Sequence, residues 1–204
     1  PGTAKQRPST KKDTVTTTNV SPEDLEGRQR IQVLYGSNTG TSEAFAQRIA
    51  SAASSKGFNA SIATLDAATG HLPIGEPVVI ITASFEGQPA DNAGRFVEQL
   101  NGLNDKELEG VSYAVFGCGN RDWALTYQRV PRLIDELMEQ RGGKKIMERG
   151  EGDASGAEFF DSFDAWEEQL WKVLGEIYDI KPSEELPQAH GLDVKIADPG
   201  TQRA

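Results

Sequence analysis

The chain has 204 residues, 37 % hydrophobic and 25 % charged, which suffices for one substantial domain with polar ends but not for two large ones. Its formal net charge of −10 argues against nucleic-acid binding and favours basic partners. The one cysteine, Cys118, precludes an internal disulfide and fits a reducing, cytoplasmic compartment. The two histidines do not have the spacing of metal ligands. No apolar run approaches the ~20 residues that span a bilayer.

The residue pattern predicts alternating strands and helices between two polar ends. Residues 1–29 are rich in Thr, Ser, Pro and Lys with almost nothing to bury, which indicates a flexible linker. In chain order the predicted elements are strand 31–35, helix 42–56, strand 60–65, strand 77–83, helix 92–100, strand 112–117, helix 130–141, strand 144–148 and helix 157–178. Residues 181–204 contain three prolines and indicate an exit toward a further domain.

Strands that alternate with helices predict a parallel sheet between two helical layers. Five such strands in a doubly wound sheet take the order 2-1-3-4-5, and ligands then bind outside the carboxyl ends, at the switch between strands 1 and 3. The loops that leave strands 1, 3 and 4 are the three unusual ones of the chain: "GSNTGT" (36–41), "SFEGQPADN" (84–92) and "GCGNRDWALTYQ" (117–128). The sequence therefore predicts an α/β three-layer fold with a ligand site where these loops meet.

The first loop leads into a helix N-terminus, where free amides and the helix dipole favour an anion. Gly36 and Gly40 allow close approach of the backbone, and hydroxyl groups add donors, from Ser37, Thr39, Thr41 and Ser42. The loop has neither the Gly-Lys-Ser/Thr ending of a Walker loop nor the G-x-G-x-x-G of a dinucleotide site. A simple capped helix start is the alternative. The excess of hydroxyls and glycines favours a phosphate site that works without a cation.

Two large aromatic residues, Phe85 and Trp123, stand in otherwise polar loops that are predicted to flank the same crevice. An exposed aromatic side chain at a loop tip either packs on a neighbour or stacks on a planar ligand. A flat ring held between two aromatic residues, next to a phosphate, describes a nucleotide or flavin mononucleotide (FMN). Asp91 is expected to cap the helix that follows the second loop.

The segments "SNTGTSE", "ASFEGQPADNA" and "FGCGNRDWALTYQ" together resemble the FMN-binding loops of the flavodoxin-like domain of diflavin reductases, the cytochrome P-450 reductase group. The resemblance is greatest to the reductase half of self-sufficient fusions, in which a haem-thiolate fatty-acid hydroxylase precedes the reductase. It implies that residues 1–29 are a linker from a haem domain, 30–180 the FMN domain, and 181–204 a connector toward an FAD/NADPH module.

The resemblance also implies a cofactor role for each loop. The phosphate of FMN would be held by Ser37, Asn38, Thr39, Gly40, Thr41 and Ser42. Phe85 and Trp123 would face the two sides of the isoalloxazine ring. The N5 edge would be bordered by Glu86, Gly87 and Gln88, the pyrimidine side by Gly119, Asn120 and Arg121, and the ribityl chain by Thr126, Tyr127 and Gln128. The set also includes Ala83, Ser84 and Cys118, the last expected to be a small buried residue rather than a nucleophile.

The implied function is electron transfer from an NADPH-reduced FAD domain to a haem-thiolate monooxygenase, without catalytic residues of the domain's own. A free-standing flavodoxin, an FMN-dependent quinone reductase and a non-redox phosphate-binding or signalling module on the same architecture are the alternatives, because fold alone does not separate them.

Acidic residues are concentrated near the end of the chain, where residues 148–179 contribute −8 of the net charge. The last helix is expected to bury a face made of Phe159, Phe163, Trp166, Leu170, Leu174 and Ile177. On its opposite face acidic residues recur at three- and four-residue spacing: Glu158, Asp161, Asp164 and Glu168. This face is either simply solvated or a docking surface for basic patches on the electron donor and acceptor.

Overall fold

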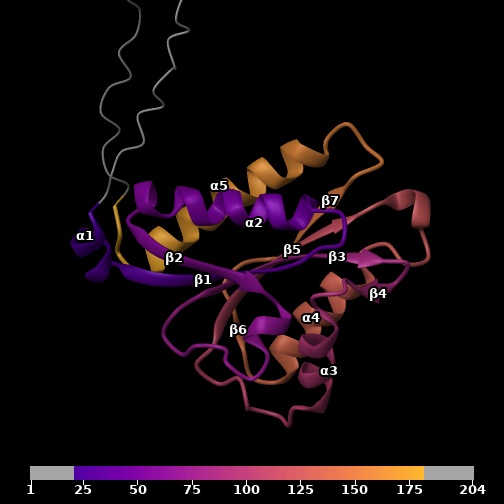
Figure 1. Ribbon diagram of the computed structural model, residues 1–204, viewed down its shortest axis with the longest axis horizontal. Helices are drawn as coiled ribbons and strands as arrows, with labels where there is room; N and C mark the ends of the chain where they lie inside the picture. Colours follow the sequence, from indigo (N-terminus) through magenta and orange to yellow (C-terminus); the bar gives the residue numbers. More distant parts are fainter. Residues whose placement is uncertain (1–20, 182–204) are drawn as a thin grey trace, which may run out of the picture.

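The computed structural model describes residues 21–181, in which a parallel sheet lies between two layers of helices (Figure 1). Helices α2 (Thr41–Ala52) and α5 (Phe159–Ile177) cover one face, and α3 (Gly94–Gly102) and α4 (Arg129–Gln140) cover the other. The described chain also contains three short 3-10 turns, η1 (Ser54–Lys56), η2 (Asp66–Ala68) and η3 (Arg121–Trp123). Within the described part of the chain, no helix combines the length and apolarity needed to cross a membrane.

The main sheet is parallel and contains β1 (Gln29–Gly36), β2 (Phe58–Thr64), β3 (Val78–Phe85), β5 (Ser112–Gly119) and β6 (Lys144–Lys145) in the order β2-β1-β3-β5-β6. A further parallel strand, β7 (Gly150–Asp153), also pairs with β5. When β6 and β7 are counted as one edge strand beside β5, this is the predicted order 2-1-3-4-5, and the flavodoxin-like fold class is confirmed. Gly36 lies opposite Thr82, and Ala83 lies opposite Cys118. The carboxyl ends of the three central strands are therefore level, and the three unusual loops leave the sheet side by side.

The sheet differs from the prediction at two strands. A two-residue strand, β4 (Gln88–Pro89), folds back antiparallel on β3. The predicted strand 144–148 is a strand only at 144–145, and the chain pairs with β5 again in β7 (Gly150–Asp153). Between them the chain leaves the ladder, where the Glu148 carbonyl accepts a hydrogen bond from the Trp166 indole. Gly150 has no side chain to meet the Phe116 and Trp166 rings, which a Cβ would contact at 2.4–2.5 Å, so β7 can pass against them.

Each face of the sheet has its own apolar core because β3 and β5 are apolar on both sides. On the α2/α5 face the Phe45 and Phe163 rings stack with their centroids 3.9 Å apart. Ile177, which was expected to be buried, is 50 % exposed, and this prediction was wrong. The end of α5 instead turns Trp171 and Tyr178 onto Phe58.

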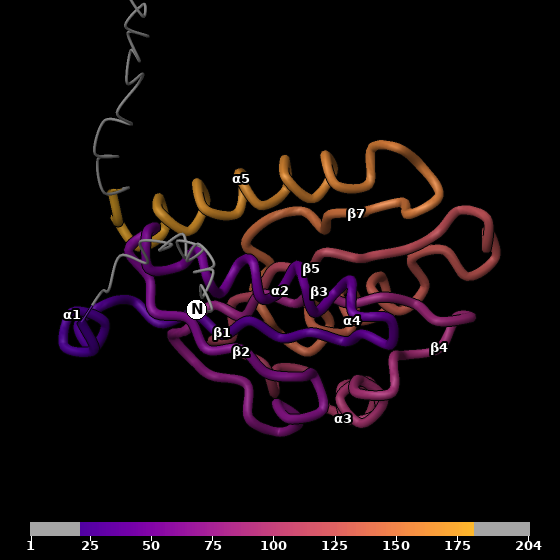
Figure 2. The backbone as a smooth tube through the Cα atoms, turned by 45° about the horizontal axis from the view of Figure 1, so that its top comes forward, coloured from indigo at the N-terminus to yellow at the C-terminus, as the bar shows by residue number. Residues whose placement is uncertain are grey.

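The two ends of the described chain lie together, at the end of the molecule opposite the three loops (Figures 1 and 2). A short helix that the sequence analysis did not predict, α1 (Pro22–Glu26), is capped by the Ser21 side chain and accepts a hydrogen bond from Asn59 in β2. Ile180 lies against Gly57, just before the same strand. The remainder of the predicted linker (1–20) and nearly all of the predicted connector (182–204) lie outside the described residues.

Candidate functional site

The three loops enclose one pocket of about 340 Å³ at the carboxyl ends of β1, β3 and β5. This volume lies at the lower end of the range of about 300–1,000 Å³ for small-molecule sites. Every residue of the predicted set lines the pocket except Gly40, Gly87, Gln88 and Arg121. The structure thus brings together side chains that are far apart in the sequence, from Ser37 in the first loop to Gln128 in the third.

The first loop is held in shape by its own polar side chains and by the second loop. Gly40, the N-cap of α2, has φ +94°, a conformation that favours glycine, and its amide donates to Ser37 Oγ at 2.9 Å. The Ser37 amide donates to Asn92 Oδ1 at 3.0 Å, and the Asp91 amide donates to Asn38 Oδ1 at 2.8 Å. The side chains of Ser37 and Asn38 therefore accept hydrogen bonds that fix the loop.

Asp91 does not cap α3, which contradicts the prediction. The N-cap position is Ala93, and the side chain that accepts a first-turn amide is Asp66, whose Oδ1 lies 3.0 Å from the Phe96 amide nitrogen. Asp66 stands in η2, after the second strand, so the cap comes from a different part of the chain. A capping residue remote in sequence leaves no local signal.

The first loop retains a group of unused donors. Within residues 21–181, the backbone amides of Asn38, Thr39, Thr41 and Ser42 donate to no protein group. The Ser42 side chain is 1 % exposed, and its hydroxyl has no hydrogen-bond partner in the described chain. An unsatisfied buried hydroxyl costs about 1–3 kcal/mol, so such a group is expected to have a partner outside the protein.

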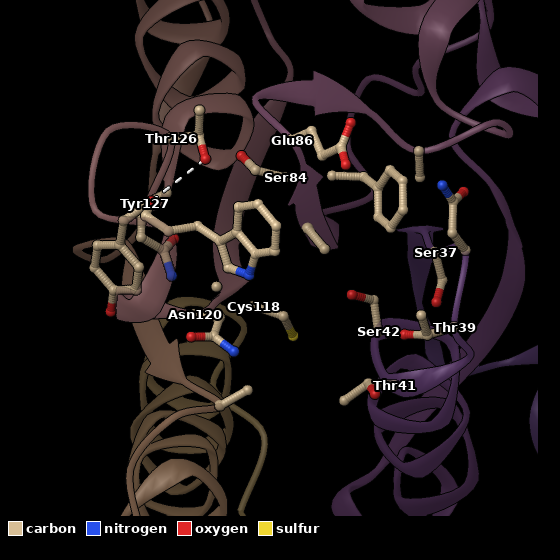
Figure 3. A pocket seen from close by; sticks show the side chains of 18 of the residues that line it. Ser37, Thr39, Thr41, Ser42, Ser84, Glu86, Cys118, Asn120, Thr126 and Tyr127 are labelled. Atoms are coloured by element: carbon tan, nitrogen blue, oxygen red, sulfur yellow. Dashed lines mark hydrogen bonds between the residues drawn. The ribbon is translucent and has the colours of Figure 1, made fainter.

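The unused donors lie on one side of the pocket. Figure 3 shows Ser37, Thr39, Thr41 and Ser42 together at the start of α2, across the open space from Asn120 and Tyr127. None of the residues that line the pocket is Lys or Arg, and Glu86 is the charged one among them. An anion here would be held by amides, hydroxyls and the dipole of α2 rather than by a cation.

The second loop is a tight β-hairpin. Phe85 pairs with Gln88, and the two residues between them both have positive φ, 50° at Glu86 and 80° at Gly87, as a type I′ turn requires. A Cβ on Gly87 would lie 2.8 Å from Thr126 Cγ2, so the turn packs closely on the third loop. Phe85, at the pocket, remains 51 % exposed.

The third loop is stabilised by its own side chains and by Asp153. Asn120 Oδ1 accepts from the Asp122 amide at 2.8 Å, which caps η3. The Arg121 guanidinium lies 4.7 Å from the Tyr127 ring centroid and 3.3 Å from Asp153, and it does not line the pocket. Hydrogen bonds from Ser155 and from the Arg121 amide lower the pKa of the Asp153 carboxyl. Trp123, which lines the pocket, is 60 % exposed.

Cys118 lies in the pocket wall and is buried, as expected. Burial raises the pKa of its thiol to about 11, although the nearby Ser42 hydroxyl acts in the opposite direction. The Ser42 hydroxyl is close enough to the sulfur to favour the thiolate, but its geometry is not that of a hydrogen bond to the thiol. The thiol is therefore protonated at neutral pH and unreactive as a nucleophile.

Three further residues line the pocket that the sequence analysis missed, Ala90, Ala154 and Phe159. Phe159 was predicted, but as part of the buried face of the last helix. Ala154 follows β7, a strand whose sequence "GEGD" has no strand pattern. Neither position carries a local signal of binding, because both reach the pocket only through the packing of α5 and β7 on the sheet.

Comparison with known proteins decides the family to which this arrangement belongs. The family model described as Flavodoxin matches residues 33–166. The chain belongs to the flavodoxin family. Among solved structures, a cysteine mutant of the flavodoxin from Pseudomonas aeruginosa matches with a TM-score of 0.60 at 22 % identity, covering 71 % of this chain and 98 % of that one. At this identity the structural match shows the flavodoxin fold alone.

More similar sequences occur within longer proteins. The chain is 52 % identical over 179 residues to a self-sufficient cytochrome P450 monooxygenase of Phanerodontia chrysosporium, covering 88 % of this chain and 17 % of that protein. It is 45 % identical over 173 residues to a bifunctional cytochrome P450/NADPH–P450 reductase of Bacillus subtilis, covering 84 % of this chain and 16 % of that protein. This flavodoxin domain therefore spans less than a fifth of the length of these relatives.

Proposed function

We propose that this flavodoxin domain binds FMN in the pocket and transfers electrons from an NADPH-reduced FAD domain to a haem-thiolate monooxygenase. The observation that carries the proposal is the pocket itself. It combines a cation-free loop of unused donors, including the buried Ser42 hydroxyl, with two exposed aromatic side chains. Such a combination suits a ligand with a phosphate at one end and a flat ring at the other.

The first loop fits the phosphate of FMN. The unused donors would bind the phosphate oxygens, with the Thr39 and Thr41 hydroxyls beside them. These donors are the Ser42 hydroxyl and the backbone amides of Asn38, Thr39, Thr41 and Ser42. Hydrogen bonds to an anion are shorter and stronger than neutral ones, which compensates for the absence of a cation. Ser37 and Asn38 would contribute mainly by holding the loop, because their side-chain oxygens already accept backbone amides.

The second and third loops fit the ring. Phe85 and Trp123 line the pocket but leave half or more of their surface open to solvent, which a planar ligand would cover. Bound FMN supplies a ring that takes up and releases electrons. The protein holds the ring, excludes water from its faces, and keeps the neighbouring Cys118 thiol neutral.

The relatives support the electron-transfer role and the domain organisation. This chain matches one segment of a self-sufficient P450 monooxygenase and one segment of a bifunctional P450/NADPH–P450 reductase. We propose that residues 1–29 connect to a haem domain and 181–204 to an FAD/NADPH module, in the cytoplasm. Both described ends lie opposite the three loops, so neither end of the described chain covers the pocket edge (Figure 1).

Electrostatics suggests where such a partner would dock. Glu158 at the N-cap of α5 and Asp161 and Glu168 on the helix are exposed, and Phe159 lines the pocket. Asp164 is already paired with Arg48 at 2.7 Å, so we assign it a structural role. The proposed docking surface is therefore the exposed amino-terminal part of α5, which would attract basic patches on the haem and FAD domains.

A free-standing flavodoxin or an FMN-dependent quinone reductase is less well supported, because the relatives at 45–52 % identity are fusion proteins. A phosphate-binding module without a ring ligand would give no reason for two exposed aromatic residues at the pocket. An absorption spectrum of the purified protein, followed by heat release and chromatography of any ligand, tests the proposal. We expect a yellow protein that releases one equivalent of FMN. A colourless protein that also fails to take up added FMN would contradict it.

A further inference from the structure

Gln128 lines the pocket and joins two strands in its wall. Its side chain is fully buried, and its Nε2 donates to the Gly117 carbonyl of β5 at 2.8 Å and to the Gly152 carbonyl of β7 at 3.3 Å. A Cβ on Gly117 would overlap the Gln128 side chain, so glycine there leaves room for the amide. Gln128 itself has φ 57°, a strained conformation for a residue other than glycine. The surroundings must therefore hold it in place.

Arg149 holds the other end of this amide. Its Nη1 donates to Gln128 Oε1 at 3.3 Å, its Nη2 lies 2.8 Å from Glu151, and its Nε lies 3.8 Å from Asp135. The side chain is 14 % exposed and does not line the pocket. Asp135 also pairs with Lys145 at 3.0 Å. The two basic residues thus share one buried carboxylate, but only Arg149 reaches Gln128.

This contact fixes the orientation of the amide. A glutamine side chain can turn by about 180° and exchange its oxygen for its nitrogen. Guanidinium only donates, so Arg149 requires the oxygen to face it and directs Nε2 to the two carbonyls. Without Arg149, the oxygen would be buried without a partner, and the turned amide would set it against two carbonyl oxygens.

The two strand ends that Gln128 joins lead directly into the pocket wall. Gly119 and Asn120 follow Gly117, and Ala154 follows Gly152, and all three line the pocket. The Ala154 amide donates to the Gly119 carbonyl at 2.8 Å, which continues the link between the two strands. A change in their separation would move the wall that faces the phosphate loop.

We propose that Arg149 is a positioning residue for the FMN site: acting through Gln128, it sets the wall formed by the ends of β5 and β7. This inference rests on the proposed function, because it assigns Arg149 a share of the FMN affinity. It goes beyond that function because Arg149 does not itself line the pocket and reaches it only through Gln128. A merely structural Arg149 would contribute to stability as Lys145 does, with no separate effect on binding.

The test compares FMN dissociation constants, by calorimetric titration, with urea unfolding of the flavin-free protein. We expect Arg149→Met to weaken FMN binding about tenfold, since a hydrogen bond to a charged group is lost behind the site, and Arg149→Lys to restore part of it. The matched control is Lys145→Met, which removes the other cation from Asp135. Lys145→Met should lower the free energy of unfolding about as much as Arg149→Met does, and it should change the FMN dissociation constant by less than about twofold.

The Gln128→Met variant shows whether Arg149 affects FMN affinity through the Gln128 amide or by another route. We expect it to weaken binding as Arg149→Met does, and the double variant to be no weaker than the worse single variant. Should Arg149→Met fail to fold, Arg149→Lys replaces it in the same cycle. The inference fails if the Arg149→Met and Gln128→Met losses of FMN affinity multiply in the double variant. It also fails if Arg149→Met and Lys145→Met lose the same FMN affinity. Either result leaves the proposed function standing. A wild-type protein that binds no FMN would overturn the proposed function together with the inference.

Discussion

The backbone amide of Asp91 donates a hydrogen bond to Asn38 Oδ1 at 2.8 Å, which ties the second loop of the pocket to the first. The two residues are 53 positions apart, so this bond forms only when β1 and β3 are in register. It leaves the Asn38 side chain committed to the loop, while the Asn38 amide remains available to a ligand.

Removing this tie should loosen the phosphate loop. We expect Asn38→Ala to lower the free energy of unfolding by about 1 kcal/mol and to weaken FMN binding about tenfold, because the unused amides are no longer held together. Urea unfolding and calorimetric titration measure the two effects. Asn101→Ala, which removes a side-chain hydrogen bond on α3 away from the pocket, is the control and should leave FMN affinity unchanged. Equal affinities of the two variants would refute this role of Asn38.

The third loop offers a matched pair of apolar residues. Trp123 lines the pocket, whereas Leu125, two residues later, is fully exposed and does not. We expect Trp123→Ala to cost about 1 kcal/mol of FMN binding free energy or more, through lost ring stacking, and Leu125→Ala to cost nothing measurable. Titration of both variants with FMN decides the matter. Unchanged affinity in the Trp123 variant would exclude the predicted stacking.

Titration of Cys118 should make the flavin-free protein less stable in alkali. Burial raises the pKa of the thiol from 9.0 to about 11, so the folded state binds the thiol proton more tightly than the unfolded state. Its contribution is complete below the unfolded pKa and is lost as pH rises from about 9 to about 11, by about 2–3 kcal/mol.

Tyr113, whose pKa is also raised by burial, adds to the alkaline loss, so a comparison with Cys118→Ala is needed. Urea unfolding as a function of pH should show a steeper loss for the wild-type protein than for this variant. Parallel curves would mean that the thiol does not titrate as its burial implies.

The docking proposal predicts a dependence on position along α5. We expect the double variant Glu158→Lys/Asp161→Lys to slow reduction of cytochrome c, a basic haem protein, by the chemically reduced FMN-loaded domain, and to weaken the salt dependence of the rate. Glu176→Lys makes the same kind of change about 22–27 Å away on the same helix and should have little effect. Stopped-flow absorbance gives the rates. Rates and salt dependence that do not differ between the variants would exclude the proposed surface.

Most of the fold was predictable because the strands that position the site have strong local patterns. β3 and β5 are nearly continuous apolar runs, β1 contains the strand-like segment "IQVLY", and the turn residues after all three mark the carboxyl edge. In a doubly wound sheet, ligands bind outside the carboxyl ends of the strands. This rule and the strand pattern together assign Ser37, Phe85 and Trp123 to one crevice.

The remainder depends on contacts between distant segments. β7 has the sequence "GEGD", which resembles a loop. It can pair as a strand because Gly150 and Gly152 have no side chains that would clash with the Phe116 and Trp166 rings. The helix cap from Asp66 and the Arg149–Gln128 contact are likewise tertiary, and neither leaves a spacing pattern. Ile177 continues the helical periodicity but is exposed, because Trp171 and Tyr178 cover Phe58 instead.

The central claim is that the loop around Ser42 binds the phosphate of FMN, and riboflavin, which lacks that phosphate, tests it most directly. Calorimetric titration of the flavin-free protein should show FMN binding about 100-fold more tightly than riboflavin or better. Ser42→Ala should weaken FMN binding about tenfold and leave riboflavin binding unchanged, because riboflavin has no phosphate to accept a hydrogen bond from this hydroxyl. Equal affinities for the two flavins, or equal losses for both in the Ser42 variant, would contradict the phosphate site and the function built on it.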